Sequence, residues 1–289
     1  MRAIPRFDRG ATLGNEMHIW PQSLALVGAG KMGGAMLKGW LDGGLAPSRV
    51  VLVDPSPSPE IIALAAARGV ALNPPAADRK APEVLILAVK PQMLDAAAPG
   101  IAELAGASTL VVSIIAGKTI ANLAARLPDA RAFVRAMPNT PAAVGRGITG
   151  AAANGAVTAR QRELTEALLS AVGRFEWLPD EALIDAVTAV SGSGPAYVFA
   201  LVEALAEAGA ALGLADDLAM RLARATVEGA GELMHREPEV AASRLRENVT
   251  SPAGTTAAAL AVLRGDGGLA PLMRRAVAAA HKRAGELAG

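Results

Sequence analysis

One glycine-rich turn, Gly28-Ala29-Gly30-Lys31-Met32-Gly33, constrains this chain more than any other segment. It follows an apolar run at residues 23–27 and precedes a helix-forming segment. At this spacing the first glycine permits a tight turn, the second lets a pyrophosphate approach the backbone, and the third lets the helix pack closely on the strand. The free N–H groups at the start of the helix can receive phosphates. The order strand, turn, helix therefore predicts a dinucleotide-binding unit that uses Gly28, Gly30 and Gly33.

An acidic side chain ends the second expected strand. The apolar run at residues 50–53 stops at Asp54, roughly 20 residues beyond the turn, where a carboxylate can accept hydrogen bonds from the adenosine ribose hydroxyls. Because prolines follow, an ordinary turn residue is the alternative. A carboxylate in the ribose role would repel a 2′-phosphate and so favours NADH. Arg79 and Lys80 are the nearest downstream cations that could still accept NADPH.

Apolar runs alternate with helix-forming segments as far as residue 179, which predicts a doubly wound parallel sheet of the α/β class, a Rossmann-type domain. We expect strands near residues 24–27, 50–53, 70–72, 84–89, 109–115, 131–135, 147–153 and 174–178. Ligands gather at the carboxyl ends of the strands in such sheets, so Lys90 is placed to touch the cofactor. A solvated loop lysine is the alternative.

The pattern changes after Pro179. From residue 181 onward we find helical periodicity and no strand pattern, so we expect a dinucleotide-binding domain at 21–179 and a helical domain at 180–289. A loose arm, or an over-long start, occupies residues 1–20. We expect a break at Ser191-Gly192-Ser193-Gly194-Pro195, with Ser193 or Gly194 as the cap of the next helix. That helix, at 195–212, is apolar on most of its circumference, which favours burial by a second subunit.

A second candidate site lies between two expected helices, from Asn248 to Thr256. Pro252 and Gly254 fix a turn, and Ser251, Thr255 and Thr256 offer hydroxyls. Unpaired N–H groups at the start of the following helix can hold a carboxylate without an arginine. An ordinary N-capping loop is the alternative, and the spacing alone leaves both open.

The composition excludes several classes of function. Lys plus Arg is 28 against 27 for Asp plus Glu, so bulk charge does not favour a nucleic-acid or membrane-surface partner. There is no cysteine, which excludes thiol catalysis and zinc–thiolate sites. We expect no bound metal and no apolar run long enough to span a bilayer. We expect a cytoplasmic protein, because residues 1–20 lack the apolar core of a secretory signal.

Five motifs together resemble the pyrroline-5-carboxylate reductase family. They are spread over residues 24–287, the first is common to many dehydrogenases, and the last two are nearly specific for the family. The motifs are Gly28-Ala29-Gly30-Lys31-Met32-Gly33, Ala88-Val89-Lys90-Pro91, Met137-Pro138-Asn139-Thr140-Pro141, Asp185-Ala186-Val187-Thr188 with Ser191-Gly192-Ser193-Gly194-Pro195-Ala196-Tyr197, and Asn248-Val249-Thr250-Ser251-Pro252-Ala253-Gly254-Thr255-Thr256.

The resemblance implies reduction of Δ1-pyrroline-5-carboxylate to L-proline by hydride transfer from NADPH or NADH, the last step of proline biosynthesis. It implies that Thr256 hydrogen-bonds the ring nitrogen, and that the helical domains of two subunits interlock in a homodimer, which in the family assembles further, often into a pentamer of dimers. The implied substrate-binding residues are Ser251, Ala253, Gly254, Thr255 and Thr256. The implied cofactor-binding residues are Gly28, Gly30, Lys31, Met32, Gly33, Asp54, Ala88, Lys90, Ala116, Asn139 and Asn248.

Two departures from the family pattern bear on these roles. Ala253 stands where the family usually has a second glycine, and Asp54 stands where many members have small polar or basic residues suited to NADPH. Two other functions compete with the reductase. A β-hydroxyacid-type dehydrogenase would need a helical lysine, and residues 179–256 contain none. A non-catalytic NAD(P)-sensing protein would not need the substrate loop. His18, His235 and His281 lie outside all five motifs.

Overall fold

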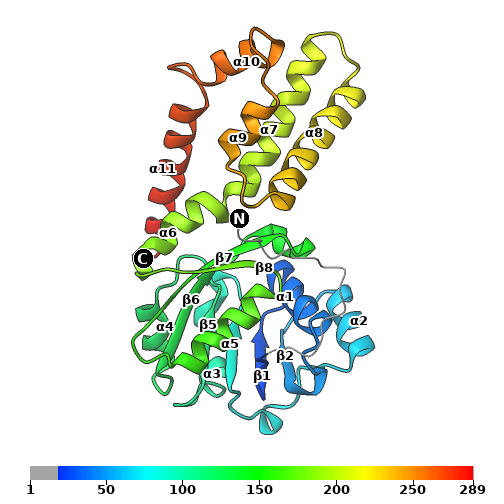
Figure 1. Ribbon diagram of the computed structural model, residues 1–289. Helices are drawn as coiled ribbons and strands as arrows, with labels where there is room; N and C mark the ends of the chain where they lie inside the picture. Colours follow the sequence, from blue (N-terminus) through cyan, green and yellow to red (C-terminus); the bar gives the residue numbers. More distant parts are fainter. Residues whose placement is uncertain (1–18, 289) are drawn as a thin grey trace, which may run out of the picture.

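The computed structural model describes residues 19–288, so the expected arm at 1–20 lies almost wholly outside the described residues. Its first part is one eight-stranded sheet with the order β3-β2-β1-β4-β5-β6-β7-β8 (Figure 1). The strands are β1 Leu24–Val27, β2 Val50–Val53, β3 Ala71–Leu72, β4 Val84–Leu87, β5 Leu110–Ser113, β6 Ala132–Met137, β7 Gly147–Ala153 and β8 Gly173–Trp177. The Rossmann-type α/β fold expected from the sequence is confirmed.

Helices cover both faces of this sheet. The helices α1 (Lys31–Asp42), α2 (Pro59–Arg68) and α5 (Ala159–Ser170) pack on one face, and α3 (Leu94–Ala102) and α4 (Ile120–Arg126) on the other. Trp40 of α1 is fully buried, and its indole N–H donates to the carbonyl of Leu168 in α5 at 2.7 Å. The sheet therefore carries two apolar layers of its own, and short 3₁₀ turns complete its connections.

The last two strands depart from the parallel pattern. Strands β1 to β6 run parallel, whereas β7 is antiparallel to β6 and β8 is parallel to β7. The reason is the connection between β6 and β7, which is the short 3₁₀ turn η4 (Thr140–Val144). A parallel pair needs a crossover of about a dozen residues or more, so the chain can only turn back.

The segment 191–195 does not form the expected turn, although Ser193 is the N-cap of the next helix, as predicted. Helix α6 (Ile184–Val187), the π-helical segment η6 (Thr188–Gly192) and helix α7 (Gly194–Ala211) follow one another without a turn, and Ser193 has helical dihedrals and makes no side-chain cap bond. The continuous stretch Glu181–Ala211 is long and apolar enough, by length and composition, to cross a membrane. The sequence-based expectation that no apolar run reaches that length is therefore also wrong.

The helical region after β8 buries little of its own surface. Helix α7 runs away from the sheet and α8 (Asp216–Arg236) returns toward it (Figure 1). Helix α9 (Ala242–Asn248) then leads to α10 (Thr255–Leu263) at the far end, and α11 (Leu269–Ala288) returns toward the sheet again. Of the residues of α7 only Ala206 is buried, and α9 and α10 bury none. Large apolar side chains are correspondingly exposed, among them Val198, Phe199, Leu201, Leu205, Leu218, Leu222, Val262 and Leu272.

A buried ion pair joins the helical region to the sheet. Arg135 of β6 is 3% exposed, and its guanidinium lies 2.9 Å from the carboxylate of Asp185 and 3.5 Å from that of Glu181. Glu181 also accepts the backbone N–H of Ile120 at the start of α4, at 2.7 Å. Because removing one partner of a buried pair leaves the other charge uncompensated, the junction depends on all of these groups.

We expect Asp185→Asn to lower the free energy of unfolding by about 3 kcal/mol, because the Arg135 charge stays buried. Asp217→Asn is the matched control: it breaks a contact of 2.6 Å with Arg221, but those side chains are 72% and 65% exposed. The control should change stability by less than about 0.5 kcal/mol. Urea unfolding at one fixed protein concentration measures both, and equal losses in the two variants would contradict the buried role of Arg135.

Candidate active site

The three glycines of the turn after β1 are required for different reasons, two by the packing of the fold and one by the space left for a ligand. Gly28 has φ +90°, and a Cβ there would lie 2.8 Å from the backbone of Ala88. A Cβ on Gly33 would collide with the carbonyl oxygen of Gly28. Gly30, in contrast, is exposed and a Cβ there would meet no protein atom within 4 Å. The packing requires the first and third glycines, while the second leaves open the space that a pyrophosphate would occupy.

The start of helix α1 is free to bind an anion. Its N-cap is Gly30, which has no side chain to accept from the first-turn N–H groups, and no acidic residue lies in that turn. Lys31 is exposed and Met32 is half-buried there. The positive end of the helix dipole and its unpaired donors therefore face the open space beside Gly30. The residues of the turn fit a dinucleotide phosphate.

Asp54 clamps the glycine turn from the end of β2. One carboxylate oxygen accepts the backbone N–H of Ala29 at 2.7 Å, and the other accepts that of Ser56 at 2.8 Å. Asn73, with φ +50°, pairs its side-chain amide with both the N–H and the C=O of Asp54, at 2.9 and 2.7 Å. Asn73 was missed by sequence reasoning, since a lone asparagine after a short strand predicts only a turn.

Three loops meet at the carboxyl edge of the sheet, because β4 neighbours β1 and β5 neighbours β4. Ala88 donates its N–H to Val27 at 2.8 Å and lies beneath the glycine turn. Lys90 after β4 and Ala116 after β5 are both exposed. The predicted cofactor residues of strands β1, β2, β4 and β5 are thus brought to one edge, although their contact with a cofactor stays a prediction.

Asn139, at the end of β6, is 8% exposed and serves the protein itself. Its side-chain oxygen accepts the N–H of Ile148 at 2.9 Å, and its side-chain nitrogen donates to the carbonyl of Ser191 at 3.2 Å. The predicted cofactor residue is therefore also a bridge between the sheet and the π-helical segment. A cofactor contact would have to share this amide.

The loop between α9 and α10 lies far from the glycine turn within one chain. Figure 1 places α10 at the end of the helical region opposite the sheet. Asn248, Ser251, Ala253 and Thr255 are exposed, whereas Gly254 and Thr256 are half-buried. The two predicted sites are therefore not brought together within the single chain that the structure describes.

The start of α10 is not an ordinary capped helix end. Its N-cap is Gly254, which makes no side-chain cap bond, so the neighbouring threonine hydroxyls are not used to cap the helix. Ala253 adopts φ +59°, the left-handed conformation that favours glycine. The N–H of Gly254 closes the preceding turn on the carbonyl of Ser251 at 3.1 Å, so the donors left at this end are the first-turn N–H groups of α10, beside the hydroxyls of Thr255 and Thr256. This arrangement favours a carboxylate site over the capping loop that the spacing left open.

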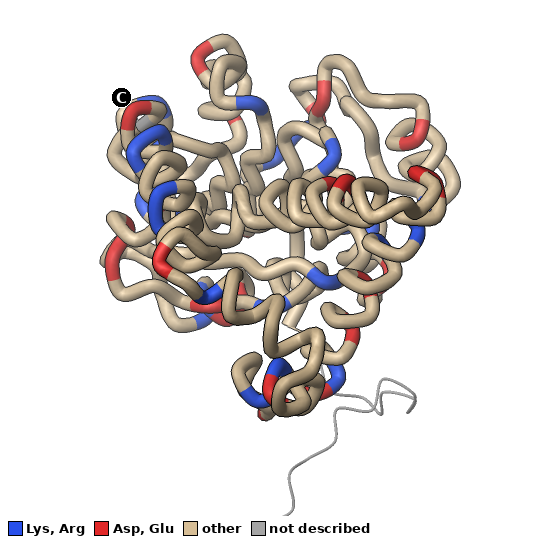
Figure 2. Tube along the Cα trace, turned by 90° about the horizontal axis from the view of Figure 1, so that it is seen from above, with Lys and Arg blue, Asp and Glu red and all other residues tan. Residues whose placement is uncertain are grey.

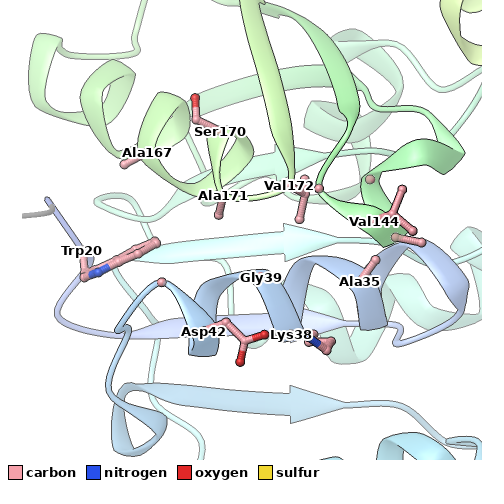
Figure 3. Close-up of a pocket in the computed structure, with 14 residues that line it drawn as sticks. Trp20, Ala35, Lys38, Gly39, Asp42, Val144, Ala167, Ser170, Ala171 and Val172 are labelled. Atoms are coloured by element: carbon pink, nitrogen blue, oxygen red, sulfur yellow. Dashed lines mark hydrogen bonds and ion pairs between the residues drawn. The ribbon is translucent and has the colours of Figure 1, made fainter. Parts of the chain in front are cut away.

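A separate pocket in the described residues lies away from this site. Figure 3 shows a pocket of about 600 Å³ between α1, α5 and η4, lined among others by Trp20, Gly39 and Val172, and none of the predicted site residues lines it. Asp42, which lines this pocket, has its pKa lowered by hydrogen bonds from Lys38 and Arg68.

Among the described residues no cluster of three metal-binding side chains comes together. Basic and acidic residues alternate over the face that Figure 2 shows.

The fold and the glycine turn define a dinucleotide-binding protein, and comparison with known proteins agrees. Residues 23–117 match the family model described as NADP oxidoreductase, coenzyme F420-dependent, and residues 181–287 match that of pyrroline-5-carboxylate reductase dimerisation. The pyrroline-5-carboxylate reductase of Pseudomonas aeruginosa is 41% identical over 92% of this chain and 96% of its own. That of Synechocystis is 47% identical over 71% of this chain and 75% of its own.

Solved structures give the same result. A pyrroline-5-carboxylate reductase from Coxiella burnetii superposes with a TM-score of 0.85 at 35% identity, covering 93% of this chain and 99% of its own. The Plasmodium falciparum enzyme with NADP bound gives a TM-score of 0.74 at 25% identity, with 92% and 98% covered. The chain belongs to the pyrroline-5-carboxylate reductase family, as the five motifs predicted.

We expect Ala253→Gly to stabilise the chain slightly, because a left-handed L-residue costs about 1 kcal/mol, part of which the greater freedom of unfolded glycine offsets. Ala258→Gly, inside α10, is the matched control and should destabilise by about 1 kcal/mol. Urea unfolding at fixed concentration measures both. Equal destabilisation by the two substitutions would show that Ala253 does not need the left-handed conformation.

Proposed function

We propose that this chain reduces Δ1-pyrroline-5-carboxylate to L-proline, taking a hydride from NADH or NADPH and one proton per turnover. The observation that carries the proposal is the start of α10, where Gly254 leaves the N–H groups uncapped and the hydroxyls of Thr255 and Thr256 free for a ligand. Family membership supplies the reaction, and the open space at Gly30 supplies the place for the dinucleotide.

We assign the dinucleotide to the carboxyl edge of the sheet. Its pyrophosphate would lie beside Gly30 on the start of α1, its adenosine ribose near Asp54, and its nicotinamide end toward Lys90, Ala116 and Asn139. When bound, the reduced nicotinamide supplies the hydride. The chain itself orients the reacting partners and excludes water.

The substrate carboxylate would be held by backbone N–H groups from Ala253 to Thr255. A protonated imine is already electrophilic, so the protein needs no strong acid. The Thr256 hydroxyl would hydrogen-bond the ring nitrogen and keep the proton on that atom while its carbon receives the hydride. Asn248 would order the loop. The histidines at 235 and 281 lie outside this arrangement.

A second copy of the chain would complete the site. The loop at 251–256 lies at the far end of the helical region from its own sheet (Figure 1), and the helical region matches a family dimerisation model. We infer that the loop of one subunit meets the dinucleotide edge of its partner. The exposed apolar faces of α7 would then be covered by protein and not by lipid, in a cytoplasmic homodimer that can assemble further, up to a pentamer of dimers. The domain boundary at 179/180 also stays a prediction.

We propose NADH as the preferred reductant. The Asp54 carboxylate is held in place by two backbone N–H groups, so its charge stays where a 2′-phosphate would lie. Arg79, the nearest candidate to accept that phosphate, has its Nε bound to the carbonyl of Pro74 at 2.8 Å. The relative from Plasmodium falciparum, in contrast, has NADP bound.

Parallel assays of NADH and NADPH oxidation with pyrroline-5-carboxylate test the function, and absence of activity with both would refute it. We expect Asp54→Asn to keep an acceptor for Ala29 but to shift the ratio of kcat/KM about fivefold or more toward NADPH, since removal of a like charge about 4 Å away is worth at least about 1 kcal/mol. Asp78→Asn, which removes an exposed carboxylate from the nearby turn, should leave the ratio unchanged. An unchanged ratio in both variants would contradict the specificity role of Asp54.

Mixed subunits test the shared site. We expect Thr256→Ala to lower kcat strongly and to leave dinucleotide binding intact, and Gly30→Asp to abolish dinucleotide binding. Co-refolded in equal amounts, the two inactive variants should recover about a quarter of wild-type activity, because half of the dimers then contain one intact site. Each variant refolded alone is the control. No recovery would place the loop and the dinucleotide edge of each site in the same chain.

A further inference from the structure

The helix that joins the two parts of the molecule contains a π turn. At η6 the N–H of Ser193 donates to the carbonyl of Thr188 at 2.8 Å, five residues earlier. In an α-helix that N–H would instead bond the carbonyl of Ala189. The wider turn therefore takes from Ala189 its usual helical donor. Such single π turns are rare and frequently occur at functional sites.

A proline takes the helical donor from a second carbonyl nearby. Ser191 would normally accept a hydrogen bond from residue 195, four positions later. That residue is Pro195, which has no N–H and lies in the first turn of α7. Two carbonyls of the same π turn, those of Ala189 and Ser191, are thus made available to side chains at the junction.

Both carbonyls are bound by specific side chains. The hydroxyl of Tyr197 donates to Ala189 at 3.0 Å. The amide of Asn139 donates to Ser191 at 3.2 Å, from the loop at the end of β6. Gly192 lies in the same turn, and a Cβ there would be 3.7 Å from the sulfur of Met137. One bond closes the turn within the helix, and the other attaches the turn to the sheet.

We propose that Tyr197 is a positioning residue for hydride transfer. Its hydroxyl holds the π turn in the register in which Asn139 and Met137 contact it, and so fixes the direction in which α7 leaves the carboxyl edge of the sheet. The inference rests on the proposed function, since it requires the nicotinamide beside the loop that starts at Met137. A shift of α7 would misplace the substrate loop that the helical region holds for the site.

Tyr197→Phe keeps the ring and removes only the hydroxyl. We expect kcat to fall about tenfold, because small misplacements of reacting atoms are costly, while the KM for the dinucleotide stays close to wild type. The primary isotope effect on kcat with 4-deuterated dinucleotide should rise, since hydride transfer becomes slower relative to product release. A purely structural tyrosine would change the thermal midpoint and leave the isotope effect unchanged.

Thr226→Val is the matched control. The Thr226 hydroxyl donates to the carbonyl of Leu222 at 2.8 Å in α8, so the substitution removes the same kind of bond away from the junction. It should leave kcat and the isotope effect unchanged. Wild-type kcat and isotope effect in Tyr197→Phe, or an equal loss of kcat in Thr226→Val, would overturn the inference. An inactive wild-type chain would instead refute the proposed function, and the inference with it.

A second measurement does not depend on a variant. Tyr197 is the chain's single tyrosine, so 3-fluorotyrosine labels one site and gives one ¹⁹F resonance. We expect that resonance to shift when oxidised dinucleotide and L-proline are added together, because the π turn contacts the loop at the proposed site. A resonance that does not respond to both ligands in an active enzyme would overturn the inference.

Discussion

The helical region cannot bury its own apolar side chains, and the assembly of the molecule depends on this constraint. The sheet is covered by helices on both faces, and its residues form two continuous apolar clusters. After β8 the only separate cluster of buried residues in the described chain is three alanines at the contact of α7 with α8. Exposed apolar area of this extent marks an interaction surface. The sheet buries its apolar side chains within one chain, whereas the helical region leaves apolar side chains exposed that a second chain can cover.

That constraint explains why the two motifs most telling in the sequence lie apart in the structure. The glycine turn needs only its own strand and helix, and the Ala253–Thr256 loop needs only its own two helices. The local structure of the glycine turn and that of the Ala253–Thr256 loop do not depend on each other. Under the proposed dimer a second subunit would supply one to the other without new folding, while the buried Arg135 pair joins the helices of each chain to its own sheet.

Local patterns in the sequence were sufficient to predict the strands of the sheet, but insufficient to predict the segment that joins the sheet to α7. The bounds of β1, β2 and β7 follow from apolar runs and from turn residues, and the structure confirms them. The reversal at β7 depends on the length of one short connection, which strand patterns do not encode. The π turn was predicted as a break, because glycine and proline usually end helices. Here side chains distant in sequence occupy the carbonyls, so Asn139 and Tyr197 could not be interpreted from their neighbours.

The structure also divides the site residues by what requires them. Gly28 and Gly33 are fixed by backbone contacts of the fold, and Asn139 by two hydrogen bonds to the protein. Gly30 has no such reason in the described chain, whereas the left-handed Ala253 belongs to the turn that the N–H of Gly254 closes on the carbonyl of Ser251 at 3.1 Å. Residues held without a structural reason, or against their backbone preference, are the ones for which a ligand is the better explanation. By this criterion Gly30 is the residue of the glycine turn for which a ligand is the better explanation, and the uncapped start of α10 stays a predicted substrate site.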